Sequence, residues 1–221
     1  MNIAIIPARG KSKRIKNKNS KLFFGKPIIT YAIELALKSK IFEEVIVTSN
    51  DEKIIKISKK YGAKALRRPD HLSKNSVPII DVVSHAIKKI NKLNTEPSKV
   101  CCIFPISPMI TKKILLKSLK VLNRKKFNYV FPVTKYTNSN QNKLFVSNDK
   151  ITKDKKNSRT FFDAGQFYWG TVKAWKKKFD IFGDKSGIIH LSSKKFVDVN
   201  NSTDWKILEK IIKNEKKRKN I

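Results

Sequence analysis

The chain is poor in cysteine, and this shortage excludes a disulfide framework. Its 221 residues contain only two cysteines, Cys101 and Cys102, which are adjacent. Neighbouring cysteines in a strand point to opposite faces and rarely bridge each other, so we expect free thiols and a reducing, cytoplasmic setting. Long apolar runs are also lacking. The first run ends at Pro7 and none approaches 18 residues, so we expect neither a transmembrane helix nor a signal peptide.

Acidic residues are scarce as well, with 17 Asp and Glu against 50 Lys and Arg and a net charge of +33. A basic excess of this size is typical of proteins that bind nucleic acid. Lys, however, supplies 43 of the basic residues and is spread along the whole chain, whereas phosphate recognition favours Arg. Lys, Asn and Ile also share A/T-rich codons. We therefore interpret the charge as compositional bias, and expect neither a nucleic-acid nor a membrane partner.

Apolar segments of strand length and helix length alternate along the chain. The patterns predict strands at 2–7, 44–49, 63–66, 99–104, 129–133 and 187–192, and helices at 27–40, 51–61, 79–91, 111–123, 171–178 and 202–217. This alternation favours a doubly wound α/β fold with a mostly parallel sheet. The polar segment 135–160 predicts an excursion from the sheet, with the character of a hairpin, and residues 161–170 return to strand-like sequence.

The loop after the first predicted strand combines cations with small polar residues. It reads Ala8-Arg9-Gly10-Lys11-Ser12-Lys13-Arg14 and continues to Lys18 and Asn19. An apolar strand that leads into such a loop is typical of polyphosphate sites in α/β proteins. The loop lacks both G-x-G-x-x-G and G-x-x-x-x-G-K-[ST], so the residues alone do not identify a nucleotide. A Lys-rich surface loop without a ligand is the alternative.

Five blocks resemble, in order and in approximate spacing, the acylneuraminate cytidylyltransferases, which activate nonulosonic (nine-carbon) acids with CTP. The blocks are the first loop, Arg68-Pro69-x-x-Leu72 followed by Asp81-Val82 and His85-Ala86, the segment from Cys101 to Pro108, the segment 163–170 (DAGQFYWG), and Asp198-Val199-Asn200 before Asp204-Trp205. The segment 163–170 and an aromatic at Phe104 are similar to the pseudaminic acid branch in particular. The resemblance covers essentially the whole chain.

The resemblance implies one domain over residues 1–221 with a three-layer, Rossmann-like nucleotide-diphospho-sugar transferase fold. It implies that CMP passes from CTP to the anomeric hydroxyl of a nonulosonic acid, and that pyrophosphate is released. Residues 135–160 would form a shortened dimerisation excursion of a homodimer. The implied nucleotide-binding residues are Ala8, Arg9, Gly10, Ser12, Lys13, Lys18, Asn19 and Arg68, of which Arg9, Lys13 and Lys18 would be catalytic.

The same resemblance assigns residues to the sugar and to a Mg²⁺ cofactor. The implied sugar-binding residues are Phe104, Ser107, Gln166, Phe167 and Tyr168. Strand alternation would turn either Gln166 and Tyr168 or Phe167 and Trp169 toward the core, and Gln166 is the best candidate for a sugar contact.

Asp198 and Asn200 would hold the metal. Asn200 stands where the family usually has a second Asp, and an amide oxygen brings no charge, so we expect weaker metal affinity. Asn50 likewise stands where the family usually has Asp. His85 lies in an apolar helix and is interpreted as a packing residue rather than a general base.

Two alternatives to a pseudaminic acid enzyme remain open. One is the same chemistry on N-acetylneuraminic or legionaminic acid. The other is a catalytically weakened nucleotide-binding protein that keeps the fold.

Overall fold

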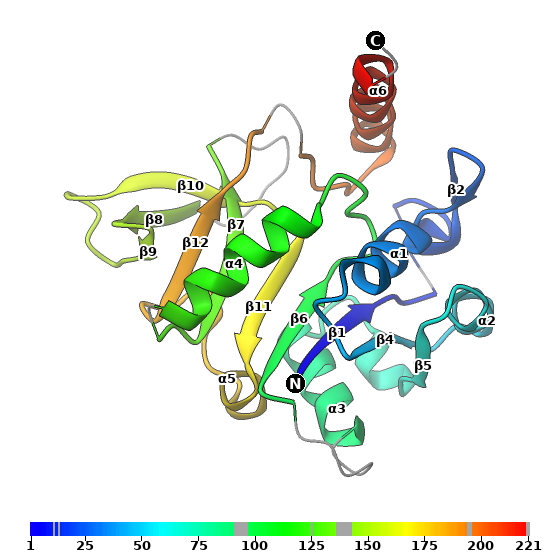
Figure 1. Cartoon of the computed structure of the whole chain (residues 1–221), viewed down its shortest axis with the longest axis horizontal. Coiled ribbons are helices and arrows are strands. Elements are labelled where there is room, and N and C mark those ends of the chain that lie inside the picture. Colours follow the sequence, from blue (N-terminus) through cyan, green and yellow to red (C-terminus); the bar gives the residue numbers. More distant parts are fainter. Residues whose placement is uncertain are drawn as a thin grey trace.

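A single large sheet runs through the computed structural model, which describes residues 1–10, 12, 14–90, 97–124, 126–135, 143–193 and 196–219. Its strands are β1 (Asn2–Pro7), β4 (Glu44–Ser49), β5 (Lys64–Arg67), β6 (Lys99–Ile103), β7 (Tyr129–Thr134), β8 (Lys143–Ser147), β9 (Lys150–Ile151), β10 (Arg159–Asp163), β11 (Phe167–Thr171) and β12 (Ser186–His190). Their order in the sheet is β10-β8-β9-β12-β7-β11-β6-β1-β4-β5 (Figure 1).

The sheet is mixed, which corrects the expected mostly parallel arrangement. Strands β6, β1, β4 and β5 are parallel, as are β7 and β12, but β11 runs antiparallel between β6 and β7. The reason lies within residues 161–170, which belong to two strands rather than one. Gly165 takes a left-handed φ of 59° and allows the chain to turn between β10 and β11. Periodicity predicts strands but carries no information on their direction.

Helices pack on both faces of the sheet. One face carries α1 (Ile29–Ser39), α2 (Glu52–Lys60) and α4 (Lys112–Arg124), and the other carries α3 (Ile79–Ile90) and α5 (Val172–Lys177) (Figure 1). The β-branched strands fill both cores, because alternate side chains point to opposite faces. Cys101 lies on the side of α1 and Cys102 on the side of α3, and both are buried free thiols, as predicted.

The helix boundaries follow from local capping residues. Asp51 accepts a hydrogen bond from the Ile54 amide at 3.1 Å and begins α2, and Thr111 accepts one from the Ile114 amide at 3.4 Å before α4. Gly62 follows α2 with a φ of 86°, a left-handed backbone conformation that favours glycine after a helix. The ends of α2 and α4 agree with the predicted helices to within two residues.

The described part of the polar excursion pairs with the chain's own sheet. Strands β8 and β9 form the expected antiparallel hairpin, and β10 pairs with β8 on one side and with β7 on the other. Since β9 pairs with β12 and β12 with β7, the five strands close into a ring. Leu144, Val146, Ile151, Phe161 and Ile188 are buried in this part of the core. Residues 136–142 of the excursion lie outside the described residues.

A separate cluster joins the C-terminal helix to the start of the chain. Helix α6 (Ser202–Lys219) packs on a short hairpin of β2 (Leu22–Phe23) and β3 (Lys26–Pro27), and the rings of Phe23 and Trp205 meet edge to face at 5.4 Å. This contact brings the segment before α6 next to the 3-10 helix η1 (Lys18–Ser20). The sequence patterns predict α6 but not the hairpin or this contact.

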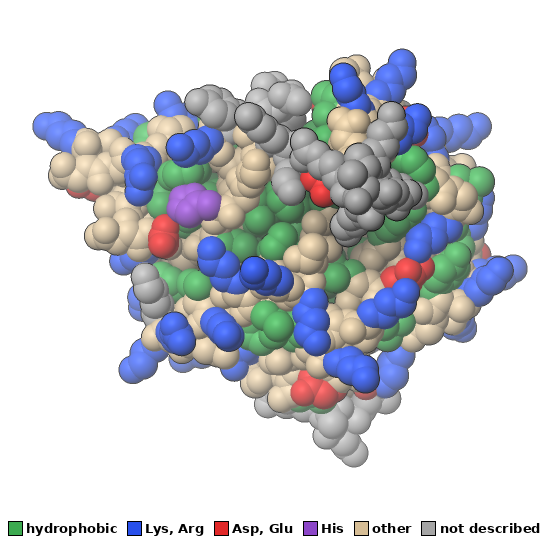
Figure 2. Space-filling model, turned by 45° about the horizontal axis from the view of Figure 1, so that its top comes forward, with side chains coloured by type: hydrophobic (Ala, Val, Ile, Leu, Met, Phe, Trp, Pro, Cys, Tyr) green, Lys and Arg blue, Asp and Glu red, His purple; other side chains and the backbone are tan. Residues whose placement is uncertain are grey.

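Basic side chains cover the surface without forming one patch on the face shown. Figure 2 shows Lys and Arg spread over this face, with hydrophobic and uncharged surface between them. This distribution agrees with the interpretation of the +33 charge as compositional. None of the described helices combines the length and the apolar character that crossing a membrane requires.

Candidate functional site

A cleft of about 270 Å³ opens at the carboxyl edge of the parallel strands. We call it the carboxyl-edge cleft. One wall is the loop after β1 together with η1, and a second wall is formed by residues 72–75, which overlap the 3-10 helix η2 (Asp70–Ser73). The cleft contains six of the predicted site residues: Arg9, Ser12, Lys18, Asn19, Arg68 and Phe104. Ligands in α/β proteins usually bind at this edge.

The loop after β1 is held by hydrogen bonds to the end of β4. The Ala8 amide donates to the Thr48 carbonyl at 3.0 Å, and the Gly10 amide donates to the Asn50 side-chain oxygen at 3.2 Å. A Cβ on Gly10 would lie 2.3 Å from a carboxylate oxygen of Asp51, so the loop requires glycine there. Ala8 and Gly10 therefore shape the loop backbone.

Arg68 is the most unusual residue of the cleft. The residue is only 5% exposed, yet its side-chain Nε and one terminal nitrogen have no hydrogen-bond partner within the described structure. Burial, and then the nearby Arg9, lower the pKa of Arg68 to about 10. None of the described residues that line the cleft is acidic. Unpaired buried donors are costly, so the arrangement is suited to a ligand that supplies oxygen acceptors.

Lys18 and Asn19 extend the basic wall. Lys18 donates to the Val199 carbonyl at 2.7 Å, and Asn19 donates to the Arg9 carbonyl at 3.0 Å. Burial lowers the pKa of the Lys18 ammonium, Asp198 opposes the shift, and Arg9 lowers the pKa further. Hydrogen bonds to backbone carbonyls thus hold this wall in place. The predicted Lys13 lies outside the described residues.

Asp198 and Asn200, the predicted metal ligands, lie side by side. The Asn200 side-chain amide donates to an Asp198 carboxylate oxygen at 2.8 Å, and Asp204 accepts from the Asn200 backbone amide at 2.8 Å. Across the described ranges, no group of three His, Cys, Asp or Glu residues could hold a metal. One carboxylate and one amide oxygen fit Mg²⁺ only with a substrate's phosphate oxygens completing its coordination, a common arrangement for this ion.

The predicted sugar-binding residues fall into different environments. Phe104 lines the cleft, and its ring meets that of Tyr168 edge to face at 5.2 Å. Ser107 and Gln166 are buried and donate to backbone carbonyls, Ser107 to that of Phe104 at 2.8 Å and Gln166 to that of Ala164 at 2.9 Å.

Phe167 corrects the expectation of a sugar contact. It is fully buried in the cluster beneath α1 and α4, since alternate residues of β11 face opposite sides of the sheet. Its burial leaves it no surface for a ligand. Gln166, the best candidate for a sugar contact, is buried as well at 2% exposure, which corrects that expectation too.

Asp163 is a buried carboxyl near Asp198 that does not line the cleft, and the sequence patterns assign it no role. It accepts hydrogen bonds from the Tyr168 hydroxyl and, at 3.0 Å, from the Gly165 amide. Burial raises its pKa to about 6, and the negative charge of Asp198 acts in the same direction. The sequence offers one signal for Asp163, namely a carboxyl group that ends a strand two residues before a turn glycine. Its contact with Tyr168 and its proximity to Asp198 depend on how the strands fold.

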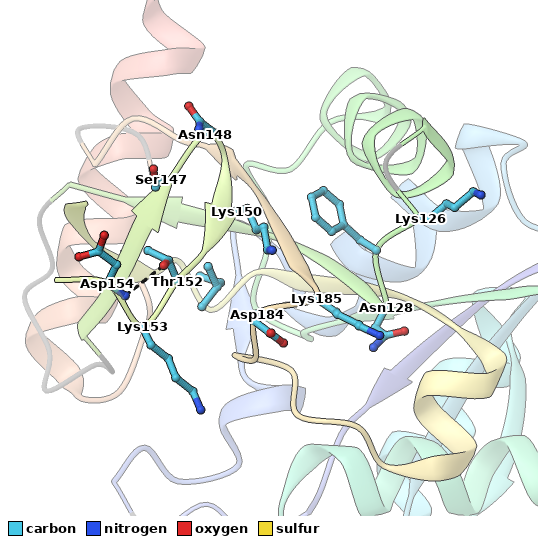
Figure 3. Close-up of a pocket in the computed structure, with 12 residues that line it drawn as sticks. Lys126, Asn128, Ser147, Asn148, Lys150, Thr152, Lys153, Asp154, Asp184 and Lys185 are labelled. Atoms are coloured by element: carbon cyan, nitrogen blue, oxygen red, sulfur yellow. Dashed lines mark hydrogen bonds between the residues drawn. The ribbon is translucent and has the colours of Figure 1, made fainter. Parts of the chain in front are cut away.

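The largest of the described cavities, about 860 Å³, lies at the opposite edge of the sheet. It is lined by the β8–β9 hairpin and by residues that precede β7 and β12, including Asn128 and Lys185. Figure 3 shows that its lysines extend in different directions and do not converge on one point. Asp154 is already engaged by backbone amides of Lys156 and Asn157. The position of this cavity and the contacts of its side chains therefore favour the smaller carboxyl-edge cleft as the functional site.

A basic cleft at the carboxyl edge of an α/β sheet defines a nucleotide-binding class of protein. Comparison with known proteins identifies the family: residues 3–218 match the cytidylyltransferase family model, and the chain belongs to that family. A pseudaminic acid cytidylyltransferase of Campylobacter jejuni is 38% identical over 95% of this chain and 97% of its own.

Two further comparisons bear on substrate and fold. An N-acylneuraminate cytidylyltransferase of Escherichia coli is 34% identical over 63% of this chain and 32% of its own. The solved structure of a CMP:2-keto-3-deoxy-manno-octonic acid synthetase complexed with CTP superposes with a TM-score of 0.76. That superposition covers 97% of this chain and 99% of the other at 14% identity, and so supports the fold.

Replacing Arg68 should stabilise the free protein. We expect Arg68→Met to raise the free energy of unfolding by about 1–2 kcal/mol, because a buried charge with unpaired donors is removed. Urea denaturation without ligand measures this change. The control is Arg67→Met, since Arg67 is exposed and paired with Glu52, and it should change stability by less than about 0.5 kcal/mol. A clear loss of stability in Arg68→Met would show that the guanidinium is structural.

Asp163 should make stability depend on pH. Its folded pKa of about 6 exceeds the ordinary value of 3.8, so its stabilising contribution is present below about pH 4 and is lost as pH rises to 6. We therefore expect Asp163→Asn to gain up to about 2–3 kcal/mol above pH 6 and nothing near pH 4.

Denaturation at several pH values, with EDTA present, measures this gain. The control is Asp154→Asn, because hydrogen bonds from Asn157 lower the pKa of Asp154, and its effect should have the opposite sign. A pH-independent difference for Asp163→Asn would contradict a raised folded pKa.

Proposed function

We propose that this protein transfers the CMP group of CTP to the anomeric hydroxyl of a nonulosonic acid, with pseudaminic acid as the acceptor, and releases pyrophosphate. The observation that carries the proposal is the cleft itself, where Arg9, Lys18 and the unpaired Arg68 gather without an acidic neighbour in the described lining. The Campylobacter jejuni relative supports the choice of acceptor. The Escherichia coli relative supports an N-acylneuraminate as the second candidate.

In this proposal, Arg9, Ser12, Lys13 and Lys18 hold the triphosphate, and Asn19 and Arg68 lie near the cytidine. The sugar hydroxyl attacks the α-phosphorus, and the bond to the leaving pyrophosphate breaks. Negative charge then builds on the α-phosphate and on the leaving group. Fixed cations at both places lower the barrier by electrostatic stabilisation and alignment. Arg9 and Lys18 suit this role because hydrogen bonds of their loop hold them in advance.

Asp198 and Asn200 are the proposed Mg²⁺ ligands. Bound there with the phosphates, the ion would add positive charge and acidify the attacking hydroxyl. The Asp198 carboxylate supplies the charge, and the Asn200 side chain would turn its oxygen to the ion. On the sugar side, Phe104 is the proposed wall of the acceptor site, and Ser107, Gln166 and Tyr168 hold that wall in place.

The remaining proposals concern organisation. We infer one domain with a three-layer α/β/α arrangement, which the large sheet and its two helix-covered faces support. A homodimer that uses residues 135–160 rests on the resemblance of that segment to the family's dimer contact. A reducing, cytoplasmic setting is supported by Cys101 and Cys102, whose thiols are free and buried.

Removing Arg9 should slow the reaction strongly and leave the fold intact. We expect Arg9→Ala to lower kcat/KM for CTP by about 100-fold or more, since a fixed cation near developing charge is lost. Pyrophosphate release with CTP, Mg²⁺ and a panel of nonulosonic acids measures the effect. Lys16→Ala is the control, because Lys16 is exposed and lies outside the cleft, and it should keep nearly full activity. Full activity of Arg9→Ala would overturn the assignment of the phosphate loop.

Restoring a carboxylate at position 200 should strengthen metal binding. We expect Asn200→Asp to lower the Mg²⁺ concentration needed for half-maximal activity, because a charged ligand replaces a neutral one. The same variant loses the hydrogen bond to Asp198 and places two carboxylates together. Its melting temperature should therefore rise with added Mg²⁺ more steeply than that of the parent. Identical metal titrations in both assays would show that position 200 is not a ligand.

A further inference from the structure

Asn50 connects the loop after β1 to η2, two segments that carry residues of the carboxyl-edge cleft. Its side-chain oxygen accepts a hydrogen bond from the Gly10 amide at 3.2 Å, and its side-chain nitrogen donates to an Asp70 carboxylate oxygen at 2.9 Å. Gly10 follows Arg9 on the phosphate-loop wall. Asp70 begins η2, which carries residues of the second wall, and lies two residues after Arg68. One side chain at the end of β4 thus touches the two segments that carry wall residues, although Gly10 and Asp70 themselves do not line the cleft.

The two contacts explain why an amide occupies this position. An amide side chain presents an acceptor to a backbone N–H and a donor to a carboxylate at the same time, which neither a carboxylate nor an apolar side chain does. An Asp at position 50 keeps the acceptor for Gly10 but brings a second carboxylate against Asp70. An Ala at position 50 leaves the Gly10 amide without its partner. The family usually has Asp at position 50. Here the Asn50 amide has a carboxylate partner, Asp70, that explains the difference.

We propose that Asn50 is a positioning residue that sets the spacing between the phosphate loop and η2, and so the fit of the nucleotide. The inference rests on the proposed function, because the ligand of the cleft is CTP. It differs from a catalytic role, since Asn50 acts through Gly10 and Asp70. Arg9 and Arg68, which precede these two residues in sequence, are the groups whose separation it controls.

A double-mutant cycle tests the connection. The variants are Asn50→Asp, Asp70→Asn, the combination of both, and Asn50→Ala, and the measurements are CTP affinity by calorimetry and the split between KM and kcat. We expect Asn50→Asp and Asn50→Ala to weaken CTP binding and raise KM about fivefold. Asp70→Asn should bind nearly normally, because an amide oxygen still accepts from Asn50. The combination should recover parental binding, because the carboxylate introduced at position 50 accepts from the Gly10 amide and from the amide introduced at position 70.

The pattern separates positioning from simple charge effects. If charge alone acted, Asp70→Asn would improve binding as much as Asn50→Asp weakens it, Asn50→Ala would bind normally, and the cycle would be additive. That result would overturn the inference. Normal CTP affinity in Asn50→Ala would also overturn it. Failure of the parent protein to bind CTP at all would instead overturn the proposed function, so the two failures are distinguishable.

Discussion

The parallel pairing of β1 with β4 and β6 is the constraint on which the site depends. It brings the ends of three strands to one edge of the sheet, so residues from the loops that follow can share a cleft. The pairing also supplies the Thr48 carbonyl at the end of β4, which holds the start of the loop after β1 through the Ala8 amide. The side chains of Arg9 and Lys18 are therefore positioned by backbone contacts.

The electrostatic character of the cleft depends on the burial of its cationic side chains and on the lack of carboxylates in its described lining. Arg68 is buried beside Arg9 with unpaired donors, and the described lining of the cleft holds no carboxylate to neutralise it. Such an arrangement costs stability in the free protein and gives binding energy to an anionic ligand. The high charge of the whole chain is a different matter, since Lys is spread over the surface shown in Figure 2. Position, more than the number of basic residues, distinguishes the site.

Comparison of particular helices and strands shows which features of the fold the sequence patterns predict. The patterns predict the strand at 44–49 and the helix at 79–91 to within one residue, because β-branched runs and helical periodicity are local signals. The direction of β11 is not predictable from its aromatic pattern. Within the site, the sequence indicates Arg9, Lys18 and Arg68. It does not indicate the bridge from Asn50 to Asp70, and the family resemblance, rather than the strand pattern, assigns the buried Phe167 to the sugar.

The α/β class of fold, the basic loop after β1 and the family resemblance could all be predicted without coordinates, because each of them is written in short contiguous segments. Which of these segments meet depends on the folded chain. The hydrogen bond from Lys18 to the Val199 carbonyl joins residues 181 positions apart, and it forms because Trp205 packs α6 onto the hairpin around Phe23. Contacts of that kind depend on how whole helices and strands pack. A local sequence pattern therefore does not identify the distant residue that completes the contact.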